Sequence, residues 1–280
     1  MSYILGFTCA DGNVHKSTLA WDLSDKFESN RQLLENINAV MTSNYPIKKR
    51  ESSYRLRISN QIILKDIQNL GIIPNKNKIL AFPNVPDIFL KDFLRGFLDG
   101  DGWITIRSRK NDQKEICIGF SNGSLSFMKM LIARLKQQLN LSVHNLRERR
   151  KISTKGVTSK YYQLEYYSHN AFKLIKYMYD SLEEDDLYLG RKFQKQLKAR
   201  EIYSEHSLKS KCFRKKEKEF GNNMKDLLYE LMFIKNLDGV QIAKELNVHS
   251  STVYRWLEKT NLRKPAVRGS KEWKQRVFRN

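Results

Sequence analysis

Two short segments of the same kind constrain the fold more than any other feature of the sequence. They are ILGFTCADG at residues 4–12 and LRGFLDGDG at residues 94–102. On a helix, Gly6 and Ala10 share one face of the first segment, and Gly96 and Gly100 share one face of the second. Small residues at this spacing allow two helix backbones to approach closely. We therefore predict two helices that pack directly against each other.

The regions that follow the two helices share one order of elements. After the second helix, strand alternation covers residues 103–109, 115–121, 143–150 and 160–167, and helical spacing covers 124–139 and 170–179. After the first helix, a hairpin fits within residues 14–23, strands fit 47–51 and 54–59, and helices fit 26–41 and 61–70. We predict a mixed α/β fold of the α+β kind, in which two pseudo-symmetric halves each have the order helix, two strands, helix, two strands, helix.

Changes in composition suggest where the chain divides. The repeat predicts a first half-domain over residues 1–88 and a second over residues 89–203. Residues 204–220 lose apolar periodicity and gain charge, which indicates a charged linker or an exposed helix. We expect residues 221–280 to form a separate, small, all-α module.

The charge balance indicates a polyanionic partner. The chain has 51 Lys plus Arg against 30 Asp plus Glu, with a net charge of +21 and a pI near 9.8. This excess is larger than solubility requires. No apolar run approaches the ~18 residues of a membrane span, and the N-terminal apolar stretch meets Asp11 too early for a signal peptide. We therefore expect nucleic acid as the partner and no membrane.

The three cysteines indicate neither a disulfide framework nor a zinc site. Cys9, Cys117 and Cys212 are odd in number and lie far apart, without a Cys-x-x-Cys pair. We expect reduced thiols, with Cys9 and Cys117 packed in the interior. The expected compartment is the cytoplasm of a bacterial or phage-infected cell, in association with the nucleoid, with an organelle as the alternative.

Each of the two helices is predicted to end in an aspartate followed by glycine. If the helices are parallel, Asp11 and Asp101 lie close together, and Gly12 and Gly102 permit a sharp exit into a strand. Two adjacent carboxylates repel unless a positive charge lies between them. Two or more hard divalent cations with oxygen ligands resolve that conflict, and Mg²⁺ is the ion we expect. Such a centre suits phosphodiester hydrolysis.

The two segments resemble the paired signature motifs of the LAGLIDADG homing endonucleases, in the single-chain form that carries both motifs. Residues 75–102 also resemble the region that precedes the second motif in this family, and the resemblance covers about residues 1–200. It implies a monomer whose two αββαββα half-domains form a saddle over double-stranded DNA. It further implies Mg²⁺-dependent cleavage of both strands of a long asymmetric target, leaving short 3′ overhangs and spreading an intron or other mobile element.

The resemblance also implies roles for individual residues. Asp11 and Asp101, with Gly12 and Gly102 beside them, correspond to the metal-binding positions. Lys76 and Lys192 correspond to the basic residues that serve the two active centres. Lys78 competes with Lys76, and Arg191 competes with Lys192. Cys9 departs from the family, which usually has an acidic or small polar residue there.

Basic side chains on the strands are candidates for contact with DNA. Strands alternate faces, so one face of each sheet can be basic while the other is covered by helices. Arginine and lysine read guanine edges and neutralise phosphates. The candidates are Lys48, Arg50, Arg55 and Arg57 in the first half, and Arg107, Arg109, Arg147, Arg149 and Lys151 in the second.

Residues 239–262, GVQIAKELNVHSSTVYRWLEKTNL, resemble a helix-turn-helix. Asn247 can take the left-handed turn conformation, and Ser250 is expected to cap the second helix. The residues expected to face a DNA groove are His249, Ser250, Ser251, Thr252, Tyr254 and Arg255. A small helical bundle that contacts protein is the alternative, and the basic tail after residue 262 favours DNA.

The sequence therefore predicts a site-specific double-strand DNA endonuclease. Two alternatives remain open at this point. One is an intron-splicing maturase that binds its own intron RNA with the same sheets. The other is a DNA-binding transcriptional regulator whose core is catalytically inert.

Overall fold

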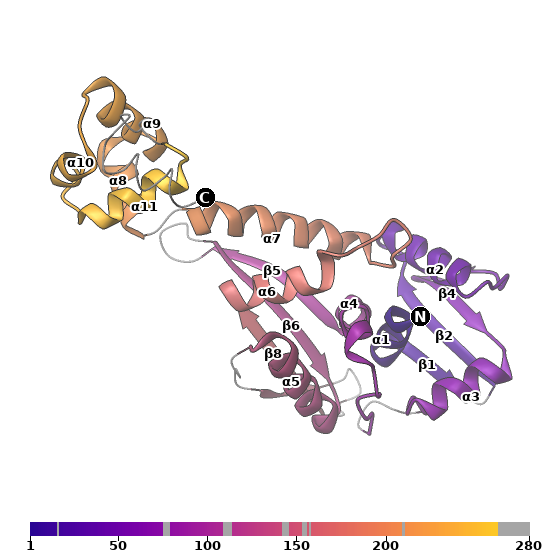
Figure 1. Ribbon diagram of the computed structural model, residues 1–280. Coiled ribbons are helices and arrows are strands. Elements are labelled where there is room, and N and C mark those ends of the chain that lie inside the picture. Colours follow the sequence, from indigo (N-terminus) through magenta and orange to yellow (C-terminus); the bar gives the residue numbers. More distant parts are fainter. Residues whose placement is uncertain are drawn as a thin grey trace. The chain divides into compact units, whose positions relative to one another are not determined.

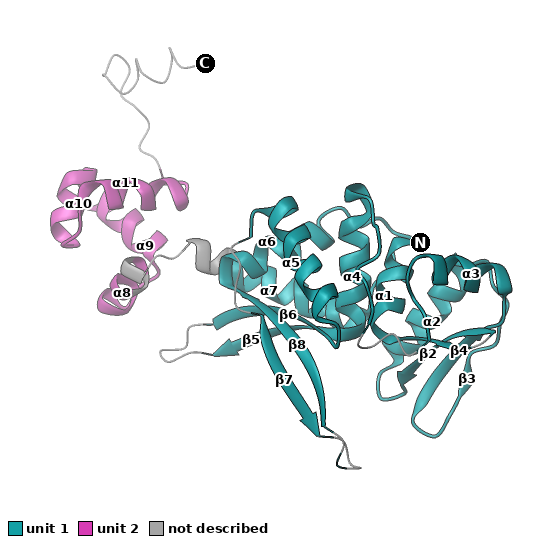
Figure 2. Ribbon diagram, turned by 90° about the horizontal axis from the view of Figure 1, so that it is seen from below, with its two compact units in different colours: residues 1–203 teal, residues 204–280 magenta. Residues whose placement is uncertain are grey.

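The computed structural model of the 280-residue chain describes residues 1–15, 17–74, 79–108, 114–141, 146–152, 156, 158–208 and 211–262. The chain forms two compact units, residues 1–203 and residues 204–280 (Figure 2). Each unit has its own hydrophobic core. No helix among the described residues is long and apolar enough to cross a membrane.

The first unit contains the same series of elements twice (Figure 1). The first series is α1 (Ser2–Asp11), β1 (Gly12–His15), β2 (Thr18–Ser24), α2 (Glu28–Val40), β3 (Lys48–Lys49), β4 (Ser53–Ile58) and α3 (Gln61–Asn69). The second is α4 (Leu90–Asp101), β5 (Gly102–Ser108), β6 (Lys114–Asn122), α5 (Leu125–Leu139), β7 (Arg147–Ile152), β8 (Thr158–Tyr167) and α6 (Ser168–Tyr179). A short 3-10 helix, η2 (Asp87–Phe89), precedes α4. The predicted order of the two halves is confirmed.

Each half contains one four-stranded antiparallel sheet. The strand orders are β1-β2-β4-β3 and β5-β6-β8-β7, so the two sheets have the same topology. Helices α2 and α3 pack on the first sheet, and α5 and α6 pack on the second. Apolar side chains of the two sheets, such as Trp21 and Phe120, are fully buried. The faces opposite the helices, called here the outer faces, carry polar and charged residues.

Helices α1 and α4 lie side by side between the two sheets (Figures 1 and 2). A Cβ on Gly6 would lie 2.0 Å from the Phe93 carbonyl oxygen, and one on Gly96 would lie 2.0 Å from the Tyr3 carbonyl oxygen. Further along, a Cβ on Gly100 would lie 2.3 Å from the Ala10 Cβ. The contacts advance together along both helices, so the helices are parallel. The predicted close packing through small residues is confirmed.

Helix α7 (Gly190–Leu208) is absent from the sequence predictions, although the segment precedes the predicted linker. Its inward face up to residue 202 consists of Lys192, Gln196, Ala199 and Ile202, all buried. Two of these four side chains are polar, so the helix has little hydrophobic periodicity. The 204–220 region, predicted as a linker or exposed helix, continues α7 to Leu208 and then forms α8 (Lys211–Phe220).

The described part of the second unit is helical: α8 is followed by α9 (Met224–Tyr229), a π-helix η3 (Glu230–Ile234), α10 (Gly239–Glu245) and α11 (Ser250–Lys259). Phe213 of α8 packs edge-on against Trp256 of α11 at 5.4 Å, so α8 belongs to this core. Asn247 has a left-handed φ of 48°, as predicted. The N-cap of α11 is His249 rather than the predicted Ser250, because the His249 Nδ1 accepts the Ser251 amide at 3.3 Å.

Candidate active site

The two aspartates predicted as metal ligands are the last residues of the paired helices. α1 ends at Asp11 and α4 ends at Asp101, where Asp11 is exposed and Asp101 is half-buried. The Asp11 Oδ2 lies 3.4 Å from the position of a Cβ on Gly100, the residue before Asp101. The close helix contact at Ala10 and Gly100 therefore brings the two acids to the same end of the interface.

Glycine is required at positions 12 and 102 because a side chain there would clash with the preceding helical turn. Neither glycine has an unusual φ. Both have extended conformations, with φ of −71° and −108°. A Cβ on Gly12 would lie 2.5 Å from the Thr8 Cγ2, and one on Gly102 would lie 2.5 Å from the Leu98 Cδ1. Each glycine thus allows the strand to leave directly from the helix end that carries the aspartate.

Lys192, which the resemblance assigns to one active centre, lies at the same end of α4, where its ammonium is hydrogen-bonded to backbone carbonyls. The residue is 3% exposed, and its Nζ donates to the carbonyl oxygens of Asp99 and Gly102, both at 2.7 Å, and also to those of Leu98 and, more weakly at 3.4 Å, Gly100. These bonds use the three N–H donors of the ammonium and neutralise the negative end of the helix dipole. Burial lowers the Lys192 pKa to about 8, although the charges of Asp99, Asp11 and Asp101 oppose the shift.

Asp99 is a residue that the sequence analysis missed. It is 1% exposed and its Oδ2 accepts two hydrogen bonds, from the Tyr3 hydroxyl and the Leu189 amide, both at 2.7 Å. Burial raises the pKa of Asp99 to about 6, against the opposing charge of Lys192 and these hydrogen bonds. Asp99 therefore connects α1, α4 and the start of α7 next to Asp101. The available signal was the first of the two acids in LRGFLDGDG, at the position where the first segment has Cys9.

Arg95 is a second buried charge that fixes the region before α7. It is 1% exposed, and it donates to the carbonyl oxygens of Leu187 at 2.9 Å and Met178 at 3.0 Å. Its Nη1 also donates to Asp92 at 2.8 Å. These bonds attach the 178–187 segment to α4, which helps to place Lys192.

A hollow of about 760 Å³ opens beside Asp101 onto the outer face of the second sheet. It is lined by Asp101 together with Trp103, Ser121, Lys151 and Tyr161, among others. The Ser121 hydroxyl donates to the Asp101 carbonyl at 3.1 Å. The acid at the end of α4 is therefore continuous with a strand surface that carries one of the predicted DNA-binding lysines.

The four candidates of the first half come together on the outer face of the first sheet. Lys48, Arg50, Arg55 and Arg57 all line one hollow of about 500 Å³. Arg55 forms a two-pronged ion pair with Asp22 on the neighbouring strand. Arg57 is exposed, so this face presents positive charge to an approaching ligand.

In the second half, Arg107, Arg147, Arg149 and Lys151 are exposed. Arg147, Arg149 and Lys151 alternate along β7 on the outer face, and Arg107 lies on β5. Arg109, Lys76 and the competing Lys78 lie outside the described residues. Arg191, the competitor of Lys192, has its guanidinium 5.5 Å from the Phe27 ring centroid at the start of α2.

The candidates of the second unit lie at the start of α11 and along it. His249, Ser251, Tyr254 and Arg255 are exposed, whereas Ser250 and Thr252 are half-buried. The His249 side chain forms the helix cap described above and a 2.8 Å contact with the Ser251 hydroxyl. The Tyr254 ring packs over Gly239, where a Cβ would lie 2.7 Å from it. α10 and α11 thus meet through a glycine-to-ring contact beside the exposed face.

The residues at the helix ends fit a hard divalent cation. Asp11 and Asp101 supply carboxylate oxygens, and the C-terminal helix ends add negative potential. No cluster of three or more His, Cys, Asp or Glu side chains suited to a metal occurs among the described residues. Mg²⁺ is commonly bound by one or two carboxylates, and water and substrate phosphate complete its coordination shell.

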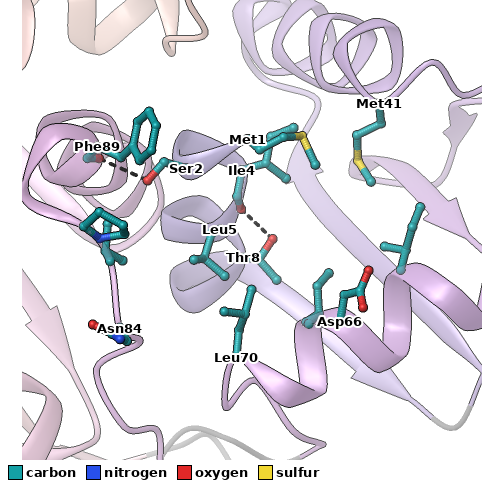
Figure 3. Close-up of a pocket in the computed structure, with 14 residues that line it drawn as sticks. Met1, Ser2, Ile4, Leu5, Thr8, Met41, Asp66, Leu70, Asn84 and Phe89 are labelled. Atoms are coloured by element: carbon teal, nitrogen blue, oxygen red, sulfur yellow. Dashed lines mark hydrogen bonds between the residues drawn. The ribbon is translucent and has the colours of Figure 1, made fainter.

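A separate pocket of about 300 Å³ lies between α1, α3 and residues 84–89 (Figure 3). Its described lining is apolar apart from a few groups, and Asp66 is the one charged side chain among them. The Ser2 and Thr8 hydroxyls at its edge are bonded to backbone carbonyls of Phe89 and Ile4 (Figure 3). The pocket includes none of the predicted site residues, and its polar groups do not converge as those of an active site do.

Comparison with known proteins gives one family match, over part of the chain. Residues 89–178 match the family model described as a LAGLIDADG-like domain. The matched segment runs from η2 into α6 and includes Asp101 and Gly102. No curated protein matches the chain.

Several solved structures have similar backbones at low identity. One is meganuclease I-SmaMI bound to uncleavable DNA, with a TM-score of 0.44, 13% identity, and coverage of 72% of this chain and 90% of that one. Another is the LAGLIDADG homing endonuclease I-GzeII in complex with its DNA target, with a TM-score of 0.45, 13% identity, and coverage of 75% and 92%. A third is the N-terminal LAGLIDADG domain of DUF199/WhiA, with a TM-score of 0.42, 14% identity, and coverage of 65% and 82%.

Proposed function

We propose that this chain is a site-specific double-strand DNA endonuclease of the LAGLIDADG homing type. The observation that carries the proposal is the placement of Asp11 and Asp101 at the same end of two helices in backbone contact. The match of residues 89–178 to the LAGLIDADG-like domain supports it. Equivalent acids from two halves suit a reaction that must occur once on each strand.

In this proposal, Asp11 and Asp101 hold divalent ions, with Mg²⁺ the expected one. Bound ions would neutralise the scissile phosphate and acidify an attacking water. Lys192, held by four carbonyl oxygens, adds a positive charge that interacts with both acids. Its N–H donors are already used, so its contribution is to set the local field and to hold the end of α4 in place.

The outer faces of the two sheets would hold the duplex on either side of the acids. The exposed basic residues of β4 and β7 neutralise phosphates and present donors to guanine edges. Because the two faces carry different side chains, the preferred target is asymmetric. A single chain then suffices, and we propose that the protein acts as a monomer. In keeping with the resemblance, the products would carry short 3′ overhangs, and cleavage would spread a mobile element.

We propose that the second unit extends the DNA footprint as a helix-turn-helix. α10, the left-handed turn at Asn247 and α11 have the connectivity that this motif requires. Tyr254 and Arg255 lie exposed on α11, where they can contact a groove or phosphates.

The test is cleavage by full-length protein carrying Asp11→Asn or Asp101→Asn. Wild-type protein is incubated with Mg²⁺ and a plasmid library of random duplex inserts, and linearised plasmids are sequenced to define a substrate. We expect either substitution to abolish double-strand cleavage of that substrate, because the metal loses a charged ligand, while binding to the same duplex persists. Asp66→Asn, which removes an exposed carboxylate from α3, is the matched control and should cleave normally.

The alternatives give other outcomes. A regulator with an inert core would bind a duplex without linearising any plasmid at any Mg²⁺ concentration. If the protein is a maturase, the wild type would bind its intron RNA and accelerate splicing, and it would linearise no plasmid of the library. Cleavage that survives both aspartate substitutions would refute the assigned chemistry.

A further inference from the structure

The registers of the two sheets allow their outer faces to be compared position by position. Each sheet starts with the glycine that follows a helix-ending aspartate. That glycine begins one row across three strands, and the rows are Gly12, Trp21 and Leu56 in the first sheet and Gly102, Phe120 and Leu164 in the second. The strand registers alone therefore define which positions of the two sheets are equivalent.

The next row outward differs in charge between the halves. It is Asn13, Ala20 and Arg57 in the first sheet and Trp103, Gly119 and Glu165 in the second. A carboxylate thus occupies the position at which the first half has an arginine. The edge strands, in contrast, are alike: Lys48 and Arg147 are equivalent, since they pair with the equivalent residues Arg55 and Gln163.

Glu165 lies beneath two arginines rather than at the surface. Its side chain is 14% exposed, whereas those of Arg107 and Arg147 are 51% and 55% exposed. Its carboxylate is 3.4 Å from the Arg107 Nη2 and 3.7 Å from the Arg147 Nη1, and it accepts the Tyr167 hydroxyl at 2.6 Å. One mostly buried anion therefore lies between exposed cations from β5 and β7.

The environment keeps Glu165 ionised. Burial raises its pKa, but the hydrogen bond from Tyr167 and the charges of Arg107 and Arg147 outweigh burial and leave the pKa below the ordinary value. An anchored guanidinium presents its planar fork in a defined direction and loses less freedom when it binds a base edge. The two arginines of these ion pairs are about half exposed, and ion pairs that are open to solvent contribute little to stability, so this cluster is better suited to recognition than to folding.

We propose that Glu165 is a positioning residue that orients Arg107 and Arg147 to recognise guanine in one half of the DNA target. This inference rests on the proposed function. The first half presents Arg57 at the position equivalent to Glu165. The two halves of the protein therefore prefer different bases at positions that lie equally far from the cleavage centre.

The test is selection of duplexes from a random library by the full-length protein in EDTA, so that binding is measured without cleavage. Wild type, Glu165→Gln and Glu165→Asp are compared, together with Arg107→Ala and Arg147→Ala. Glu148→Gln is the matched control, since it removes a carboxylate from the opposite face of the same sheet. The readouts are base preference at each position, affinity for the selected duplex and affinity for an unrelated duplex.

We expect wild type to prefer guanine at certain positions in one half of the target. Arg107→Ala and Arg147→Ala should each lose the preference at one of these positions. Glu165→Gln should weaken both preferences and reduce affinity for the selected duplex about tenfold, in line with the loss of a well-oriented arginine contact. Affinity for the unrelated duplex should stay equal or rise, because a negative charge is removed. Glu165→Asp should restore part of the preference, and Glu148→Gln should match wild type.

Unchanged base preference in Glu165→Gln would overturn the assignment. Equal weakening in both halves of the target would also overturn it, because that result indicates a general loss of structure. If wild-type protein selects no duplex sequence at all, the proposed function itself fails, and the role of Glu165 fails with it.

Discussion

Replacing Gly96 with alanine tests whether the α1–α4 contact places the two acids. The Cβ of an alanine there would lie 2.0 Å from the Tyr3 carbonyl oxygen and 2.9 Å from the Phe7 amide nitrogen, whereas ordinary contact begins at 3.4 Å. Both neighbours are backbone atoms of a buried helix, so no side chain can move aside to relieve the clash. The helices must separate by about 1 Å or more, in the manner of other overpacked interiors.

Two opposing effects set the expected change in stability. Alanine favours the helix over glycine by about 1 kcal/mol, and overpacking costs about 1–3 kcal/mol and occasionally more. At this distance we expect the upper end of the cost, with a net loss of about 2 kcal/mol after the gain in helix propensity. For a unit of this size, that loss lowers the unfolding temperature by about 4–8 °C.

The effect on cleavage should be larger than the effect on stability. A displacement of about 1 Å in catalytic groups can reduce a rate about 100-fold, and Asp11 and Asp101 move with the helices. Calorimetry and single-turnover cleavage at a temperature well below unfolding measure the two effects separately. Gly190→Ala is the control, because a Cβ there would lie 3.3 Å from the Ser29 Cβ and needs only a small adjustment. If Gly96→Ala unfolds and cleaves like wild type, the proposed link between the helix interface and the acids is wrong.

Two further predictions concern buried groups. Lys192→Met should lower the free energy of unfolding by about 1–3 kcal/mol, because the carbonyls of Asp99 and Gly102 lose their donor. Denaturant titration measures this change. An unchanged unfolding midpoint would contradict the capping role of Lys192. Burial raises the pKa of the Cys117 thiol to about 11, so iodoacetamide at pH 8 should leave Cys117 unmodified in the native protein and modify it after denaturation, as mass spectrometry can show. Rapid native modification of Cys117 would contradict its buried position beside Glu165.

The sequence predicted those parts of the fold that depend on local patterns. The repeated small residues predicted the α1–α4 contact, and alternation predicted most strands within a few residues of their bounds. Helix α7 was missed because polar side chains, Lys192 and Gln196, occupy its buried face. The partners of Lys192 are carbonyl oxygens at the end of α4, which no pattern within α7 reveals.

The same distinction separates the predicted and missed residues of the candidate site. Asp11 and Asp101 could be found because each ends a recognisable motif. Asp99 looked like part of that motif, and its role became visible only when Tyr3 and Leu189 were brought to it from distant segments. Glu165 was hidden for a related reason: its importance comes from the register of β6 and β8 and from arginines on two other strands.

The two halves keep in common what their shared interface requires and differ elsewhere. Gly6 matches Gly96 and Asp11 matches Asp101, since backbone contact and the paired acids depend on both helices at once. Asp99 has no acidic counterpart, because a buried carboxylate needs donors, and those donors come from α1 and from the segment that leads into α7. Cys9, buried at the equivalent position, needs no such support. In a single chain, the outer faces of the two sheets can therefore carry different residues at equivalent positions, such as Arg57 and Glu165. The contact between α1 and α4 meanwhile keeps Asp11 and Asp101 at equivalent positions.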